Sequence, residues 1–176
     1  MMKKMAMIIL LLAGLILAAC NAEEEGSGTE EASRDIEQLV YEYSTGTFKD
    51  VSASITSKEL IVTNENNEEE IYDLPEDKFF LSIAPFEEVT HPCFDHSLTG
   101  CQGEMVKEAF AVEITDSEGN IVVNETMETM DNGFIDLWLP RNDEFEVKIS
   151  YEGKTAEEVL STYEGDGTCV TTMQLL

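Results

Sequence analysis

Between residues 78 and 176 the chain repeats one pattern, in which a short apolar or alternating segment is followed by a turn rich in Gly, Asn and Asp. In FEVKISY, for example, Phe145, Val147, Ile149 and Tyr151 alternate with polar residues, as in a strand that buries one face. Segments of similar character are KFFLSIAPF, AFAVEIT, IVVNETM, FIDLWLP and CVTTMQL. Short strands joined by turns predict an antiparallel β-sandwich or a small barrel.

Residues 35–76 have a different pattern, which begins with apolar residues at helical spacing. These residues are Ile36, Leu39, Val40 and Tyr43. They predict a short amphipathic helix that is capped by Ser33 and ends near Gly46. The segments ELIVT and EIYDLP that follow are predicted to be two strands or a hairpin. So small a unit cannot bury much core alone, so we expect it to lean on the next domain or on a second protomer.

The fold class predicted from these patterns is α+β. A small N-terminal unit of a helix and strands (35–76) precedes an antiparallel β-sandwich-like domain (77–176).

Residues 1–19 have the pattern of an export signal, because two lysines precede an apolar run that ends in small residues. Cys20 follows directly in LAAC, which reads as a bacterial lipobox. We therefore expect cleavage before Cys20 and lipidation of its sulfur, which anchors a lipoprotein to the outer side of a membrane in the cell envelope. An ordinary signal peptide with an incidental Cys20 is the alternative. Residues 20–34 are predicted to be a flexible acidic tether.

The chain is strongly acidic, with 37 Asp and Glu residues against 10 Lys and Arg residues and a formal charge of −27. Phosphate binding requires a basic face, so this balance argues against a nucleic-acid partner. A charge of this kind sets no specific cation site, and a solvated surface is the simpler interpretation.

Three cysteines remain once Cys20 carries lipid: Cys93, Cys101 and Cys169. In an exported protein an odd number indicates one disulfide and one free thiol. The alternative is a metal site, because both histidines of the chain, His91 and His96, lie within five residues of Cys93. Thiolates are soft donors that favour Cu(I), with Zn²⁺ next. From the residues alone, a structural disulfide and a metal or redox site both remain possible. Cys169 can join the other two cysteines only if the last strand runs beside their loop.

Longer stretches of the sequence resemble the CueP family of exported bacterial copper-binding proteins over roughly residues 40–176. These stretches are STGTFKDVSASITSKELIV, FFLSIAPFEEVTHPCFDHSLTGCQGE, NGFIDLWLPRN and TCVTTMQLL. The resemblance implies copper binding in the cell envelope, a role in copper tolerance, copper delivery to exported proteins such as a copper-zinc superoxide dismutase, and a homodimer. The lipobox and the acidic tether depart from the family pattern.

The family's three cysteines fall on Cys93, Cys101 and Cys169. His96 is the fourth candidate ligand, and His91 is either a ligand or a residue that shapes the loop before Pro92. We expect Cu(I) to bind through two or three thiolates and His96, with zinc as the other candidate metal. Two thiols can also reduce Cu(II) while they form a disulfide. We therefore expect that the protein is not an enzyme, apart from a stoichiometric or slow thiol-dependent reduction of the metal.

Two other function classes compete with copper binding. One is a lipid-anchored β-sandwich that binds carbohydrate or protein, carries one structural disulfide and has no metal role. The other is a thiol oxidoreductase, which the sequence disfavours because no CxxC begins a helix.

Overall fold

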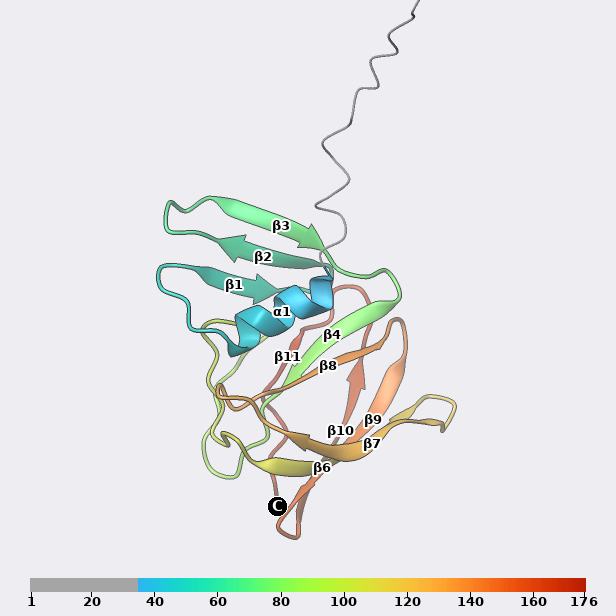
Figure 1. Cartoon of the computed structure of the whole chain (residues 1–176). Coiled ribbons are helices and arrows are strands. Elements are labelled where there is room, and N and C mark those ends of the chain that lie inside the picture. The colour runs from blue at the N-terminus through green and yellow to red at the C-terminus, as the bar shows by residue number, and fades with distance from the viewer. Residues whose placement is uncertain (1–34) are drawn as a thin grey trace, which may run out of the picture. The chain divides into compact units, whose positions relative to one another are not determined.

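The first element of the computed structural model, which describes residues 35–176, is helix α1 (Ile36–Thr45) (Figure 1). Asp35 is its N-cap, because the Asp35 carboxylate accepts a hydrogen bond from the backbone N–H of Glu37 at 3.2 Å. The prediction of Ser33 as the cap is therefore wrong. Ser33, the signal segment, Cys20 and the tether all lie outside the described residues, so the predictions about them stay predictions.

The strands in the described part of the chain form three sheets. The first sheet has the order β3 (Glu69–Asp73), β2 (Glu59–Thr63), β1 (Ser52–Ile55) and β5 (His96–Ser97). The second has the order β10 (Lys154–Ser161), β9 (Glu144–Tyr151), β6 (Ala109–Asp116) and β7 (Ile121–Glu128). The third has the order β11 (Cys169–Val170), β4 (Lys78–Ile83) and β8 (Ile135–Pro140). One helix with three mostly antiparallel sheets confirms the predicted α+β fold class.

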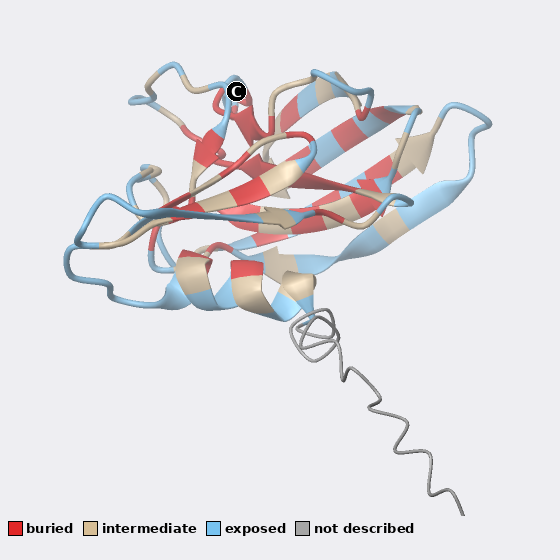
Figure 2. Ribbon diagram, turned by 90° about the horizontal axis from the view of Figure 1, so that it is seen from above, coloured by how far each residue is buried: buried red, intermediate tan, exposed pale blue. Residues whose placement is uncertain are grey.

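The largest hydrophobic cluster is built by strands of the second and third sheets, as predicted from their alternating patterns. On β9, Phe145, Val147 and Ile149 are buried while the residues between them are exposed. Figure 2 shows the same alternation of buried and exposed residues on several strands. The cluster joins these residues to Phe79, Leu81 and other apolar side chains of β4 and β8. The core therefore has the layered form of a β-sandwich.

A second cluster lies under α1 and the first sheet. Val40 from α1 packs with Ile55 and Leu60 of the first sheet and with Phe80 of β4, and the half-buried Trp138 packs against them. The N-terminal helix and strands thus share apolar contacts with β4 and β8, as expected for a unit too small to bury its own core. The domain boundary near residue 76 stays a prediction.

Several strands differ from the sequence prediction: β1 and β5 were not predicted, and two further differences concern β10 and β11. Strand β10 was not predicted, because Ala156 is the only residue on it that is fully buried and the alternation is correspondingly weak. Strand β11 pairs with β4 in parallel, with Cys169 opposite Ser82, so the third sheet is mixed rather than antiparallel. This parallel pairing brings the C-terminal segment back to the strand that precedes the cysteine loop.

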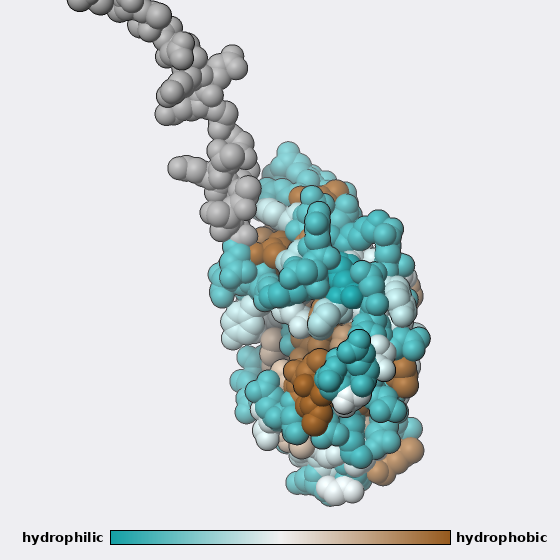
Figure 3. Space-filling model, turned by 90° about the vertical axis from the view of Figure 1, so that its right-hand side faces the viewer, coloured by the Kyte–Doolittle hydropathy of each residue, from teal (hydrophilic) through white to brown (hydrophobic). Residues whose placement is uncertain are grey.

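The surface is mostly polar, as the negative charge of the chain requires. The face in Figure 3 is largely hydrophilic, with separate small hydrophobic patches. Among the described residues, no helix is both long and apolar enough to cross a membrane.

Candidate metal centre

Four of the five predicted metal ligands come together in one group: Cys93, His96, Cys101 and Cys169. One ligand atom from each lies within 4.8 Å of the others. The first three belong to the segment that follows β4, whereas Cys169 is the first residue of β11, so the group joins parts of the chain far apart in sequence. Three sulfur atoms and one imidazole at this separation form the donor set of a soft metal ion.

Backbone hydrogen bonds hold β11 beside the cysteine loop. The Cys169 N–H donates to the carbonyl of Phe94 at 2.9 Å. One residue earlier, the Thr168 hydroxyl accepts a bond from the His96 N–H at 2.9 Å and donates to the carbonyl of Ile55 at 2.6 Å. The expectation that Cys169 reaches the loop only through the last strand is confirmed. Thr168 was not predicted to support the site, although it directly precedes Cys169 in the sequence.

A close contact between two glycines sets the position of the segment that carries Cys101. The Gly103 N–H donates to the carbonyl of Asn132 at 2.6 Å. A Cβ atom on Gly103 would lie 2.5 Å from the carbonyl oxygen of Gly133, and Gly133 itself has a φ of +80°. Only glycine fits both positions without displacing backbone. The turn at residues 130–133 therefore acts as a fixed support for the Cys101 loop.

The three sulfurs are arranged for both pairing and exchange. The structure pairs Cys93 with Cys169, whose Cα atoms are 5.6 Å apart, a separation that suits a disulfide. Cys101 is the unpaired cysteine of the described residues, and its Sγ lies 3.5 Å from the Sγ of Cys93. A thiolate at Cys101 can therefore reach the disulfide sulfur of Cys93, as thiol–disulfide exchange requires.

His96 is fully buried beside these sulfurs, against the ring of Phe134 at a centroid distance of 4.5 Å. Its Nδ1 lies 3.5 Å from the Sγ of Cys169. Burial, with a smaller contribution from the charge of His91, lowers the pKa of His96 to about 4. The ring is therefore neutral near pH 7, the state that ligates metals.

The second ring nitrogen of His96, Nε2, has an unusual environment for a buried polar atom. Within the described residues, His96 Nε2 is buried without a hydrogen-bond partner. Buried polar groups are rarely left unpaired unless they serve a function, because desolvation costs about 1–3 kcal/mol. A buried neutral imidazole beside three sulfurs suits a soft cation such as Cu(I) better than a hard one.

His91 is not brought into this group. It is half-buried, and its Nε2 lies 3.1 Å from the backbone carbonyl of Gln102, which places it as a hydrogen-bond donor between two parts of the loop. This contact agrees with a role in shaping the loop, and the assignment of His91 as a ligand stays a prediction.

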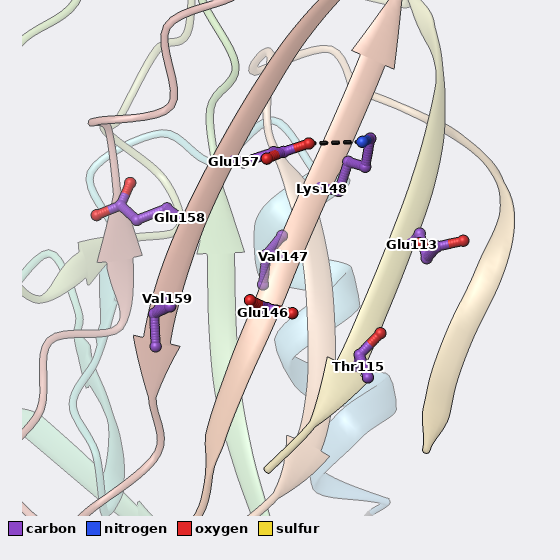
Figure 4. Close-up of a pocket in the computed structure, with 8 residues that line it drawn as sticks. All are labelled: Glu113, Thr115, Glu146, Val147, Lys148, Glu157, Glu158 and Val159. Carbon is purple, nitrogen blue, oxygen red and sulfur yellow. Dashed lines mark hydrogen bonds and ion pairs between the residues drawn. The ribbon is translucent and has the colours of Figure 1, made fainter. Parts of the chain in front are cut away.

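A hollow lined by acidic side chains lies elsewhere on the surface, away from the cysteine group. It lies on the outer face of β6, β9 and β10, where Glu113, Glu146 and Glu157 line it and Lys148 is hydrogen-bonded to Glu157 (Figure 4). Carboxylates are hard donors that prefer Mg²⁺ or Ca²⁺. This hollow therefore offers none of the soft donors of the cysteine group.

Comparison with known proteins agrees with the geometry of the site. The family model described as "Periplasmic copper-binding protein CueP" matches residues 36–174. A solved structure, described as "Crystal Structure of S.CueP", is 43% identical in sequence, with a TM-score of 0.77, over 82% of this chain and 91% of that chain. No curated protein matches the chain. The matched residues include Cys93, His96, Cys101 and Cys169, and the chain belongs to the CueP family.

Proposed function

We propose that the chain binds Cu(I) through the thiolates of Cys93, Cys101 and Cys169, with His96 Nδ1 as the fourth donor. The observation that carries this proposal is the grouping of the four ligand atoms within 4.8 Å. Three soft sulfurs favour Cu(I) over Cu(II), and the neutral imidazole needs no proton loss to ligate. The copper-binding description of the family supports the choice of copper over zinc.

The same thiols can supply electrons to copper. Two cysteine thiols that reduce two Cu(II) ions to Cu(I) release two protons and form one disulfide. Cys93 and Cys169 are the pair that the structure joins, and Cys101 remains as a free thiol whose Sγ lies 3.5 Å from that of Cys93. The disulfide and the metal site are thus alternate states of the same cysteines. The reduction of Cu(II) is stoichiometric unless another thiol reduces the disulfide again.

The cellular role follows from this chemistry and from the family description. The chain binds copper in the cell envelope outside the cytoplasm, is held at a membrane by lipid on Cys20 and the acidic tether, and contributes to copper tolerance. It passes copper to an exported acceptor such as a copper-zinc superoxide dismutase, and it acts as a homodimer. The periplasmic, copper-binding description of the family and the lipobox of the sequence support the location and the handling of copper, whereas the acceptor and the homodimer rest on the resemblance to the family.

A Cu(I) titration tests the proposal. The reduced full chain is titrated under anaerobic conditions against a competing Cu(I) chelator, beside single Ser replacements of Cys93, Cys101 and Cys169. The expected result is stoichiometric binding that weakens with each replacement and is lost when all three are replaced. Stoichiometric binding that survives the triple replacement would overturn the thiolate site.

The pairing of Cys93 with Cys169 favours one competing function, a binding module with a structural disulfide. In that case the disulfide stays closed, and neither it nor Cys101 responds to copper. Thiol counts of the purified protein before and after copper addition separate the two functions. An inert disulfide and an inert Cys101 would favour the module.

A further inference from the structure

Met130 brings a thioether into the same small cluster as the three cysteines. The buried members of this cluster are Ala84, Phe134 and Cys169, and three partly buried residues pack against them: Cys93, Cys101 and Met130. Every sulfur of the cluster other than that of Met130 belongs to the candidate metal centre. Met130 is thus the source of a thioether sulfur in the apolar cluster that borders the metal centre.

The backbone fixes Met130 in place. The Met130 N–H donates to the carbonyl of Phe134 at 2.9 Å, and the Gly133 N–H donates to the carbonyl of Met130 at 2.9 Å, which closes a tight turn. Within this turn, the carbonyl of Asn132 accepts the hydrogen bond from the N–H of Gly103, which lies two residues after Cys101. Met130 and Cys101 therefore lie on two segments that are bonded to each other, so their relative position does not depend on a long free loop.

Burial divides the sulfurs into an outer and an inner set. Met130, Cys93 and Cys101 are partly exposed, whereas Cys169 is 8% exposed and His96 is 0% exposed. An ion that enters from solvent meets the outer set first. A neutral thioether at this level can bind a soft cation without adding charge to the site.

We propose that Met130 Sδ is a Cu(I) ligand of this centre and favours copper over zinc. The inference rests on the proposed function, because it concerns the same metal. Thioethers are soft ligands that suit Cu(I), whereas zinc sites in proteins are built from Cys, His, Asp and Glu. Met130 thus adds a donor that distinguishes the two metals, which the thiolates and His96 do not.

The contribution of Met130 is greatest in the disulfide state. When Cys93 and Cys169 are joined, their sulfurs are no longer thiolates. The donors that remain at the site are the Cys101 thiolate, His96 Nδ1 and the Met130 thioether. These three can hold a Cu(I) ion that the oxidation of the two thiols has produced, so the ion is kept at the site when the disulfide closes.

Met130→Leu tests this inference, because leucine keeps the apolar volume and removes the sulfur. Met127→Leu is the matched control, since Met127 is also partly buried but packs against the main core of the sandwich. Cu(I) and Zn²⁺ affinities of the full chain are measured by chelator competition in the reduced and disulfide forms. Met130→Leu is expected to lower the Cu(I) affinity of the disulfide form on the order of tenfold, within the range for groups around a metal. The effect should be smaller in the reduced form, and Zn²⁺ affinity and the control should be unchanged.

X-ray absorption at the selenium edge gives a direct readout that does not depend on affinity. In the full chain labelled with selenomethionine and loaded with Cu(I), a copper neighbour of selenium is expected in the wild type and in Met127→Leu, and it should be lost in Met130→Leu. Absence of a copper neighbour in the wild type, or equal Cu(I) affinities of wild type and Met130→Leu in both forms, would overturn the inference and leave the thiolate site standing. A wild type that binds no Cu(I) would overturn the proposed function as well.

Discussion

His96 Nδ1 lies 3.5 Å from Cys169 Sγ, although 73 residues separate them in the sequence. The contact depends on the parallel pairing of β11 with β4 and on Thr168, which binds the backbone of His96. The histidine thus contacts the sulfur of a residue near the far end of the sequence.

Replacing His96 by leucine should separate copper binding from stability. Leucine fills the buried space without an unpaired nitrogen, so the free energy of unfolding of the metal-free protein should rise by about 1 kcal/mol. Cu(I) affinity should fall by about 10- to 100-fold, because a donor is lost. Urea unfolding and chelator competition measure the two quantities. A destabilised protein with unchanged Cu(I) affinity would show that His96 has only a packing role.

Gly103→Ala should destabilise the protein by about 1–3 kcal/mol, the range typical of overpacking, because its Cβ atom would lie 2.5 Å from the carbonyl oxygen of Gly133. Displacement of the loop should also weaken Cu(I) binding through Cys101. Gly119→Asn is the control, since a Cβ atom at Gly119 meets nothing within 4 Å and Asn tolerates a positive φ. Urea unfolding that shows equal stability of Gly103→Ala and wild type would contradict the role of the glycine contact.

Cu(II) should be consumed at two ions for each disulfide formed, with Cys93 joined to Cys169 and Cys101 left free. The measurement combines Cu(I) detection with alkylation of the remaining thiols and mapping of the modified peptides. Cys101→Ser should still reduce Cu(II), because both members of the pair remain, whereas Cys169→Ser should not form this pair. Unchanged thiol counts after Cu(II) is consumed would exclude the protein as the reductant.

Asp136 should make the stability depend on pH. Burial raises the pKa of its carboxyl, although hydrogen bonds donated by Ser44 and Ser82, each at 2.6 Å, act in the opposite direction. The folded state therefore holds this proton more tightly than the unfolded state, so the contribution of Asp136 to stability falls as pH rises from the unfolded pKa of about 4 through the folded pKa.

Asp136→Asn removes this titration and keeps groups that can bond to both serines. Relative to wild type, the variant should gain stability as the pH is raised from about 4 towards 7, as measured by urea unfolding at each pH. A difference between the two proteins that stays constant over this range would contradict the raised pKa of Asp136.

The periodic strands were predictable from the sequence because each carries its own pattern. Phe145, Val147 and Ile149 show which face of β9 is buried without reference to any other segment. β10 lacked this signal, because Ala156 is its only fully buried residue. The parallel pairing of β11 was not predictable, since two short segments far apart in sequence carry no local sign of their direction.

The candidate site was predictable as a set of residues but not as an arrangement. The clustering of both histidines near Cys93 pointed to metal chemistry, yet only the fold distinguishes the buried His96 from His91, which contacts the carbonyl of Gln102. Met130 was missed because TMDNG reads locally as a turn. Its place in the same apolar cluster as the cysteines depends on the contact of that turn with Gly103.

The most direct test of the central claim is X-ray absorption at the copper edge of the full chain loaded with one Cu(I) ion under reducing conditions. The account predicts a first shell dominated by sulfur, with a nitrogen contribution that is lost in His96→Leu and a sulfur contribution that falls in each of the three Cys→Ser variants. A shell of oxygen and nitrogen alone, unchanged by these replacements, would contradict it.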